Sequence, residues 1–396
     1  MISFNEALRL LLAEAVPIER TERVALERAD GRVAAGDVVA ASDVPPFDRA
    51  AMDGYAVIAA DTTGATAASP RQLRLAHRIY TGDAPSTQRV LSGECVAVAT
   101  GAPMPPGADA VVIVEDTSRD GDVVTMKSSV SPRQNVGARA ADIARGATFL
   151  RAGDILSPAR LGALAATGHV HVDVFARPSV AIVSTGNEIV APGAPLGHGQ
   201  IYDINRITLS TAVERHGGVA VPLSSADDRA GDLDASLDRA LAEDVVVFSG
   251  GSSVGERDLV KDLLRERGRV IFHGIAVKPG KPTAFAIIDG KPVFGMPGYP
   301  TSCLSNAYML LAPFLRKMAR LQPWTPRTID APLSRAITSV ADRHQFYTVR
   351  IVNGQAEPAF KASGDITSLA NADGYIEIEA GVNRVEAGQS VRVTIF

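Results

Sequence analysis

The sequence contains little cysteine, no excess of one charge and no long apolar segment. Its two cysteines, Cys95 and Cys303, are too few for a disulfide scaffold, and no C-x-x-C pair indicates a structural zinc site. Lysine and arginine together number 40, against 44 acidic residues, so the formal net charge is −4. Because there is no basic tail or patch, we expect no binding to nucleic acid and no attachment to a membrane.

Targeting segments are also lacking. No run approaches the ~18 consecutive apolar residues that a membrane span needs. The N-terminus reads as a helix in which Ser3 and Glu6 form a capping box, and it has neither the basic start nor the cleavage site of a signal peptide. Together with the low cysteine content, this predicts a protein of the reducing cytoplasm.

The middle of the chain has the pattern of an α/β domain. Short apolar runs that read as strands alternate with helical patterns that end at glycine turns. The strands are expected at 179–183, 219–223 and 244–248, and the helices at 204–216 and 233–241. This alternation predicts a parallel sheet with helices on both faces.

Two other regions read as β structure. From 55 to 122, short apolar runs are separated by Gly/Pro turns, among them the loop Thr100–Gly107, which predicts a small all-β domain. The last seventy or so residues alternate in the same way after a break at 322–326, and we expect a small β-barrel or sandwich there. Between these regions, Ser157 and Pro158 predict the start of a helix that ends at Gly168.

Small polar residues follow two of the expected strands, at 184–188 and 249–258. In open α/β sheets, ligands bind beyond the carboxyl ends of the strands, and glycine turns there let backbone N–H groups approach an anion. The second turn also contains a G-x-S-x-G pattern around Ser253, so a serine hydrolase is an alternative at this stage. The acids that follow the serines suit binding of a polyanion or a metal at least as well.

Two further segments could bind an anion. Lys278-Pro279-Gly280-Lys281-Pro282 is a rigid turn that could direct two ammonium groups at one place, although it lacks the spacing of a phosphate-binding Walker loop. Residues 295–302 precede a helix expected over 303–318, which Thr301 or Ser302 could cap. Cys303 in its first turn is either an activated nucleophile or a small buried residue.

Several carboxylates lie at expected loop ends, and hard cations such as Mg²⁺ prefer such oxygen ligands. They are Asp53, Glu188, Asp227 and Asp258. From the residues alone we therefore expect a multidomain cytoplasmic enzyme with an α/β core that binds a phosphorylated, anionic small molecule together with a divalent cation.

An ordered set of short motifs runs through the whole chain. It comprises Asp43–Asp48, Ala51–Ala56, Thr100–Pro103, Ser184–Gly186, Ser249–Gly251 with Val254–Gly255, Lys278–Pro282 and Pro297–Pro300. In this order and spacing they resemble the molybdopterin molybdenumtransferase family, which is related to the C-terminal domain of gephyrin. The resemblance implies insertion of molybdate, the second substrate, into adenylylated molybdopterin, with Mg²⁺ present and AMP released, to give molybdenum cofactor.

The resemblance also implies an architecture and partners. The expected domains are a discontinuous elongated domain (1–44 and 135–176), an inserted β domain (45–134), a molybdopterin-binding α/β domain (177–321) and a C-terminal β-barrel (322–396). It implies a homodimer whose site lies between subunits, and transient contact with a molybdopterin adenylyltransferase. The gephyrin relationship leaves a non-catalytic scaffold with the same fold as an alternative.

Matched position by position, the resemblance implies these site residues. Catalytic roles fall on Asp53, Thr100, Glu188, Asp227, Asp258 and Lys278, of which Asp53, Glu188 and Asp258 would hold the metal. Substrate binding falls on Ser184, Thr185, Gly186, Ser249, Gly250, Gly251, Ser252, Gly255, Lys281, Pro297, Gly298, Arg350 and Ser368. The chain departs from the family's pattern at Arg49 and Ala50 (commonly Asn-Ser), at Asn187 (often Asp) and at Gly274 (Lys in some members).

Overall fold

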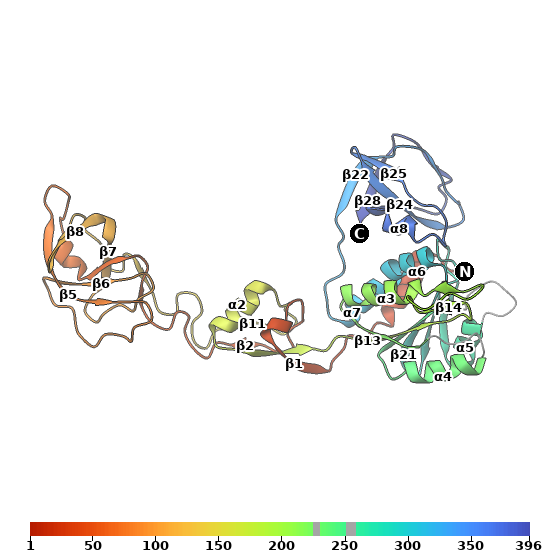
Figure 1. Cartoon of the computed structure of the whole chain (residues 1–396), viewed down its shortest axis with the longest axis horizontal. Helices are drawn as coiled ribbons and strands as arrows, with labels where there is room; N and C mark the ends of the chain where they lie inside the picture. Colours follow the sequence, from red (N-terminus) through yellow and green to blue (C-terminus); the bar gives the residue numbers. More distant parts are fainter. Residues whose placement is uncertain (225–229, 251–258) are drawn as a thin grey trace. The chain divides into compact units, whose positions relative to one another are not determined.

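The computed structural model describes residues 1–224, 230–250 and 259–396, which form two compact units (Figure 1). Unit 1 comprises Met1–Glu22 and Phe175–Phe396, and unit 2 comprises Arg23–Val174. No helix of the described ranges is long and apolar enough to cross a membrane.

Unit 1 is built around a six-stranded sheet. Its order is β16 (Val219–Pro222), β13 (Ser179–Ser184), β17 (Val245–Ser249), β21 (Lys291–Met296), β20 (Ala284–Ile288) and β18 (Arg269–His273). Every neighbouring pair from β16 to β21 is parallel, as expected, but β20 runs antiparallel to both of its neighbours. The reason is a tight hairpin at Asp289 and Gly290, which both have positive φ, of 50° and 77°.

Alternate residues of the central strands enter two separate hydrophobic clusters. In β13, Val180 and Ile182 pack on one face of the sheet, and Ala181 and Val183 pack on the other. Helices α4 (Ala230–Ala240) and α5 (Leu259–Arg267) cover one face, and α3 (Ile204–Arg215), α6 (Pro300–Asn306) and α7 (Ala312–Met318) cover the other (Figure 1). The expectation of helices on both faces is confirmed.

The first helix, α1 (Phe4–Ala13), packs on this α/β body. Ser3 caps it by accepting a hydrogen bond from the Glu6 amide at 3.2 Å, while the Glu6 carboxylate pairs with Arg9. Ala7 and Leu11 are fully buried in the cluster beneath α3 and α7. Residues 1–22 therefore lie in unit 1, whereas the family resemblance implies that they belong to the elongated domain.

The helix expected over 303–318 begins three residues earlier and changes its winding. Pro300 occupies its first turn and no side chain caps it, so the expected cap by Thr301 or Ser302 is wrong. After α6 the chain continues as a π-helix, η4 (Ala307–Leu311), and then as α7. Pro313 has no N–H to donate back along the helix, which favours irregular winding just before it.

The C-terminal part of unit 1 contains a second sheet. Its order is β19 (Val277–Lys278), β24 (His344–Val352), β26 (Gly374–Ile378), β28 (Ser390–Ile395) and β22 (Thr328–Pro332), with β25 (Gln355–Pro358) also paired to β24. Residues 270–277, which are mostly apolar in the sequence, contribute to two sheets. The segment divides at Gly274 (φ +80°), after which Val277 and Lys278 join the C-terminal sheet.

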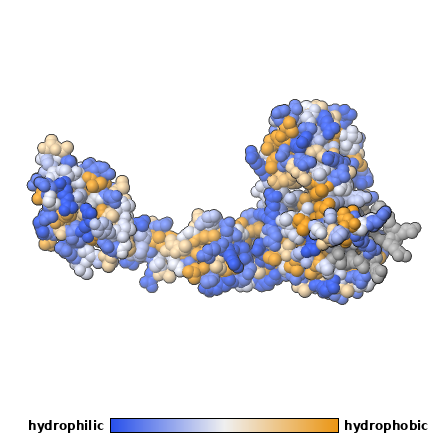
Figure 2. Space-filling view, in the orientation of Figure 1, coloured by the Kyte–Doolittle hydropathy of each residue, from blue (hydrophilic) through white to orange (hydrophobic). Residues whose placement is uncertain are grey.

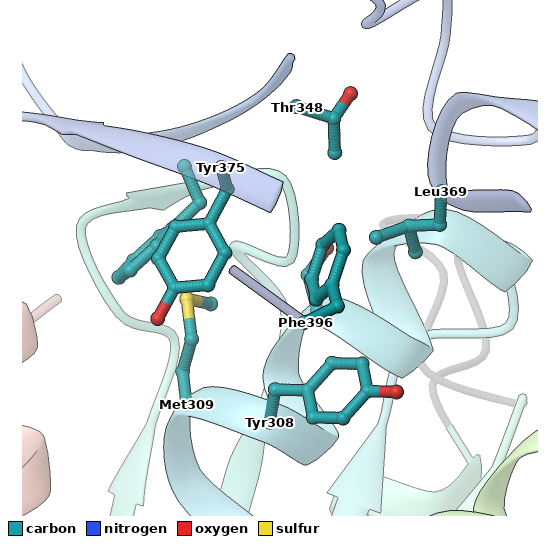
Figure 3. A pocket seen from close by; sticks show the side chains of 8 residues that line it. Tyr308, Met309, Thr348, Leu369, Tyr375 and Phe396 are labelled. Atoms are coloured by element: carbon teal, nitrogen blue, oxygen red, sulfur yellow. The ribbon is translucent and has the colours of Figure 1, made fainter. Parts of the chain in front are cut away.

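A small pocket lies where η4 meets this C-terminal sheet (Figure 3). Its lining is mostly aromatic and apolar and carries no charged side chain; it consists of Ser305, Tyr308, Met309, Phe346, Thr348, Leu369, Tyr375 and Phe396. An anionic substrate would find no counter-charge there, so the pocket is not a candidate for the main site.

Unit 2 contains a six-stranded sheet and a smaller region with one helix. The sheet order is β7 (Ala110–Ile113), β4 (Gly54–Val57), β6 (Glu94–Val98), β5 (Arg71–Ile79), β9 (Val123–Met126) and β8 (Thr117–Asp120). The helix is α2 (Pro158–Ala166), capped by Ser157 and followed by Gly168 with φ +86°, as expected. The sheet confirms the prediction of β structure between residues 55 and 122.

The remaining short elements join neighbouring segments in pairs. They are β1 (Thr21–Ala25) with β12 (His171–Phe175), β2 (Val38–Val39) with β11 (Thr148–Leu150), β3 (Arg49–Ala50) with β10 (Val136–Gly137), β14 (Ile189–Val190) with β15 (Ile201–Tyr202), and β23 (Ile337–Thr338) with β27 (Arg384–Val385). Single turns of helix occur at η1 (Leu26–Arg28), η2 (Ala59–Thr62), η3 (Val114–Asp116) and α8 (Thr367–Ala370).

Candidate functional site

The turns that follow three neighbouring parallel strands of unit 1 meet one another. The Thr185 amide donates to the Ser249 carbonyl at 2.9 Å, and the Gly250 amide donates to the Met296 carbonyl at 3.2 Å. A Cβ on Gly298 would lie 3.3 Å from the Gly250 Cα. The ends of β13, β17 and β21, which carry predicted binding residues, are therefore gathered at one edge of the sheet.

Gly250 is a position at which no side chain fits. Its φ of +102° is a conformation that other residues rarely adopt, and a Cβ there would lie 2.5 Å from the Thr185 carbonyl oxygen. Glycine is needed because the two turns approach each other backbone to backbone, as expected for a ligand-binding edge.

Asn205 holds two of these turns and was not singled out by the sequence. It lies in the first turn of α3 and is 8% exposed. Its Nδ2 donates to Ser249 Oγ at 2.7 Å and to the Gly298 carbonyl at 2.8 Å. The signal that could have revealed it is the preceding helix cap, Asp203, which places Asn205 beside the strand ends.

Buried polar atoms without a hydrogen-bond partner concentrate at this edge. Within the described part of the chain they include Ser184 Oγ, Thr185 Oγ1 and Asn205 Oδ1, and also Asn306 Oδ1 on the neighbouring α6. An unpaired buried polar group costs about 1–3 kcal/mol, so these atoms are candidates for hydrogen bonds to a ligand.

Glu188 lies at the outer rim of the same edge. Its carboxylate folds back over Gly186. A Cβ on that glycine would lie only 2.6 Å from Glu188 Oε2. The Glu188 carbonyl accepts from the Ile201 amide at 2.8 Å, which joins β14 to β15 and fixes the backbone. The side chain is exposed, so this carboxylate is available to a ligand or a cation.

The lysine turn is fastened to α6. The Asn306 amide nitrogen donates to the Gly280 carbonyl at 3.0 Å and to Thr283 Oγ1, and Thr283 Oγ1 donates to the same carbonyl at 2.8 Å. Lys278 is partly buried and Lys281 is exposed, on either side of Gly280. The turn that carries these two lysines is thus held through its Gly280 carbonyl by Asn306 and Thr283.

Helix α6 brings this turn close to the strand ends. Cys303 Sγ lies 3.8 Å from Ser249 Oγ, while Asn306, three residues further on, holds Gly280. Residues three apart on a helix have Cβ atoms about 5–6 Å from each other. Ser249 and the lysine turn therefore lie along one side of α6, about one helical turn apart.

Cys303 is a buried structural residue. It is fully buried, and burial raises the pKa of its thiol to about 12. A thiolate nucleophile at this position is therefore excluded, and the alternative reading of a small buried residue is confirmed.

The C-terminal sheet contributes a loop over the start of α6. The Thr301 amide donates to the Ser363 carbonyl at 3.1 Å, and Thr301 Oγ1 donates to the Asp365 carbonyl at 2.8 Å. Both polar groups of Thr301, one of the two residues expected to cap the helix, are therefore bonded to this loop. Ser368 is fully buried and accepts from the Lys361 amide at 3.0 Å, so it supports this loop.

Arg350 lies apart from that loop, on β24. Its guanidinium pairs with Glu357 on the neighbouring β25 at 3.2 Å. The side chain is about half exposed.

In unit 2, Asp53 and Thr100 are brought together although 47 positions separate them. The Thr100 amide donates to Asp53 Oδ1 at 2.7 Å and its hydroxyl donates to the same oxygen at 3.0 Å. These bonds, the backbone one first, lower the pKa of the Asp53 carboxyl. Both residues are exposed, so the pair faces solvent as a fixed carboxylate.

The loops that carry this pair brace each other through their backbones. The Ala50 amide donates to the Ala102 carbonyl at 2.9 Å, and the Gly101 amide donates to the Ala50 carbonyl at 2.8 Å. Thr81 Oγ1 donates to the Thr100 carbonyl at 2.5 Å. Ala50 is buried, so the methyl group that replaces the family's serine acts here in packing.

Five predicted site residues lie outside the described residues: Asp227, Gly251, Ser252, Gly255 and Asp258. The same is true of Ser253, the candidate hydrolase nucleophile. Within the described ranges, no group of three or more His, Cys, Asp or Glu side chains is arranged to hold a metal ion.

Three family models cover most of the chain. They are the MoeA N-terminal region (domain I and II) at residues 2–168, the probable molybdopterin binding domain at 181–317, and the MoeA C-terminal region (domain IV) at 330–396.

Curated relatives and a solved structure agree with these models. Molybdopterin molybdenumtransferase 2 of Mycobacterium tuberculosis is 37% identical over 97% of both chains, and the molybdopterin molybdenumtransferase of Haemophilus influenzae is 31% identical over 100% of this chain and 99% of its own. The crystal structure of the molybdopterin biosynthesis MoeA protein of Pyrococcus horikoshii is 32% identical with a TM-score of 0.83, covering 100% of both chains. The chain therefore belongs to the molybdopterin molybdenumtransferase (MoeA) family.

Proposed function

We propose that this protein is a molybdopterin molybdenumtransferase, which inserts molybdate into adenylylated molybdopterin and releases AMP to give molybdenum cofactor. The observation that carries the proposal is the edge of the unit 1 sheet. There, unpartnered buried hydroxyl and amide groups lie beside a turn with two lysines, a combination suited to a polar, multiply charged guest. The names of full-length relatives support the same reaction.

The lysine turn would bind the oxyanion. Lys278 and Lys281 would offset negative charge on molybdate or on the phosphates, which is the main demand of phosphoanhydride chemistry. The side chains of Ser184 and Thr185, beside the turn at Ser249 and Gly250, would hydrogen-bond the pterin and its phosphate. Binding roles for Gly251, Ser252 and Gly255, which lie outside the described residues, and for Pro297, Gly298 and Gly186 belong to this proposal.

Mg²⁺ would be held by Glu188, Asp53 and Asp258. The donor chemistry suits this cation, because exposed carboxylates are hard oxygen ligands and leave room for water. In Asp53 the two bonds from Thr100 occupy Oδ1, so Oδ2 is the oxygen that remains for a cation. When bound, the ion would neutralise charge that develops on the phosphate oxygens. Asp227 would act beside it.

Assembly and location are part of the proposal. The proposed residues are divided between unit 1 and unit 2, which fits a site shared between the subunits of a homodimer. Large hydrophobic residues are exposed on unit 1 at Ile201, Ile207 and Tyr299, and apolar areas lie among polar ones on its visible face (Figure 2). We further propose a cytoplasmic enzyme with transient contact to a molybdopterin adenylyltransferase.

The four-domain division remains a proposal. Separate hydrophobic clusters support it for the elongated domain (1–44 and 135–176) from residue 23 onward, the inserted β domain (45–134), the α/β domain (177–321) and the C-terminal domain (322–396), whereas residues 1–22 pack with the α/β domain. Closure of the last sheet into a barrel, and a role for Arg350 and Ser368 near the substrate, belong to the same proposal.

The test is an assay of AMP release from adenylylated molybdopterin with and without molybdate and Mg²⁺. The wild-type protein should release AMP only when both are present. Glu188→Gln should lower kcat by about 100-fold or more, because an amide is a poor ligand for a hard cation. Glu379→Gln, an exposed carboxylate directly after β26 of the C-terminal sheet, is the control.

The same assay separates the scaffold alternative. A folded wild-type protein that binds the nucleotide substrate but releases no AMP under any combination of molybdate and Mg²⁺ would contradict the proposed enzyme and favour a scaffold.

A further inference from the structure

Asn306 is a buried amide committed to one turn of the protein. It is fully buried at the last position of α6, where the helix passes into the π-helical segment η4. Its Nδ2 donates to the Gly280 carbonyl at 3.0 Å and to Thr283 Oγ1. Thr283, also fully buried, donates through Oγ1 to the same carbonyl at 2.8 Å. One carbonyl oxygen is thus held by two side chains.

The chemistry of these groups fixes the orientation of the amide. A backbone carbonyl can only accept a hydrogen bond, so the nitrogen of Asn306 must face Gly280 and its oxygen must face away. That oxygen, Oδ1, has no partner among the described residues. Gly280 has φ +106°, and a Cβ on it would overlap the Asn306 amide. A side chain at position 280 would therefore displace the Asn306 amide.

Holding Gly280 determines where two cations can reach. Gly280 lies between Lys278 and Lys281, and the Lys281 carbonyl is fixed in addition by the Ile275 amide at 3.0 Å. A backbone that is fixed in advance reduces the ordering that must accompany binding of an oxyanion. The contact from Cys303 to Ser249 fixes α6 against the strand ends at the same time.

We propose that Asn306, with Thr283, is a positioning residue that holds Lys278 and Lys281 in place for an oxyanion of the reaction. The inference rests on the proposed function, because it assigns the lysines to molybdate or to the phosphate of the nucleotide substrate. Asn306 touches neither substrate. It acts through the Gly280 carbonyl.

The test compares steady-state constants of three variants. Asn306→Asp removes the N–H donors and sets a carboxylate against the carbonyl. Thr283→Val removes one donor with little change in shape, and Thr283→Ser restores it. For the first two variants we expect KM for one oxyanion substrate to rise by about 10- to 100-fold, with kcat changed less than the KM. Thr283→Ser should return KM to within about threefold of the wild-type value.

Two arms identify the oxyanion. A rise confined to the KM for molybdate assigns the lysines to molybdate, and a rise confined to the KM for adenylylated molybdopterin assigns them to phosphate; either result supports the positioning role. Thr62→Val is the matched control, since Thr62 in unit 2 is an equally buried threonine that donates to the Ala59 carbonyl. It should lower thermal stability and leave both KM values unchanged.

The inference is overturned if Thr283→Val, shown to be folded by circular dichroism, keeps both wild-type KM values, or if kcat alone falls in all three variants. This outcome differs from failure of the proposed function. In that case the wild-type protein itself would release no AMP. Direct titration of the wild-type and Thr283→Val proteins with molybdate would still measure whether the turn binds an oxyanion. It would also show whether Thr283 strengthens that binding.

Discussion

Thr100 donates two hydrogen bonds, from its amide and its hydroxyl, to a single oxygen of Asp53. Two exposed loops of unit 2 are thereby joined at the two residues for which the family resemblance implies catalytic roles. The carboxylate is held in its charged form and in one orientation, which leaves its second oxygen toward solvent.

Removing the hydroxyl of Thr100 should raise the pKa of Asp53. The backbone bond at 2.7 Å remains in Thr100→Val, so the pKa should rise only part of the way from its lowered value toward the ordinary 3.8. In the wild-type protein, the stabilisation by this carboxylate is present above its ordinary pKa and is lost as the pH falls through its lowered pKa. In the variant this stabilisation should be smaller, and its loss should be complete at a higher pH.

Carbon-13 NMR titration of the Asp53 carboxyl measures this directly. Thr100→Ser, which keeps the hydroxyl, should titrate like the wild type. Equal pKa values for Asp53 in the wild type and Thr100→Val would show that the hydroxyl bond is not formed in solution.

Gly250→Ala should damage the strand-end edge. The new Cβ would lie 2.5 Å from the Thr185 carbonyl, and the φ of +102° is unfavourable for alanine by at least about 1–2 kcal/mol. We expect a lower melting temperature and loss of AMP release. Gly231→Ala in α4, where no described residue lies within 4 Å of the new Cβ, should instead stabilise the protein by up to about 1 kcal/mol. This account is contradicted if calorimetry shows that both variants are more stable than the wild type, or that both are less stable.

Neither cysteine should react in the native protein. Burial raises the pKa of both Cys95 and Cys303 to about 12, so almost no thiolate forms near neutral pH and alkylating reagents have no access. Mass spectrometry after iodoacetamide treatment at pH 8 should show no label on the folded chain and two labels on the unfolded one. Rapid labelling of Cys303 in the folded chain would reopen its reading as a nucleophile.

His216 should make unit 1 sensitive to acid. Burial is the main cause that lowers its pKa from 6.5 to about 4, with Arg316 and Arg215 adding to the effect. Between pH 6.5 and about 4 the unfolded chain binds a proton at His216 that the folded chain does not. The free energy of unfolding therefore decreases as the pH is lowered through this range, by on the order of 3 kcal/mol in total. Above pH 6.5 the residue has no such effect.

Trp324 reports on this loss. It is the single tryptophan, and its ring lies 5.2 Å from that of His216. Denaturant unfolding followed by its fluorescence at pH 7 and pH 4 should show a smaller loss of stability in His216→Phe than in the wild type. The exposed His198→Phe serves as the control, and an identical pH dependence in all three proteins would refute the assignment.

Much of the fold could be predicted from the sequence because local signals and tertiary structure agree. Ser157, Pro158 and Gly168 delimit α2 by capping chemistry that involves only neighbouring residues. The alternation of strands and helices likewise predicts the α/β sheet. The antiparallel β20 was missed because Thr283–Ile288 reads as a buried strand in either direction, and the direction is set by the hairpin at Asp289 and Gly290.

The candidate site was predictable in its loops but not in the groups that hold them. Glycines and lysines in turns mark the strand ends and the 278–282 turn. Asn205 is indicated only by the cap residue Asp203 before it, and Asn306 by no local signal, since a single asparagine within a helical pattern has no distinctive spacing. The burial of Ser368 and the pairing of Arg350 with Glu357 depend on contacts across the C-terminal sheet, which no local pattern contains.

The central claim is that the oxyanion binds at the 278–282 turn, which Asn306 of α6 holds, and at the adjoining strand ends. Anomalous diffraction at the molybdenum edge, from crystals grown with molybdate and AMP, tests it most directly. The account predicts a molybdenum peak whose oxygen ligands lie within hydrogen-bond distance of Lys278 Nζ, and loss of that peak in Lys278→Ala. A well-occupied peak elsewhere with none at the 278–282 turn would contradict it.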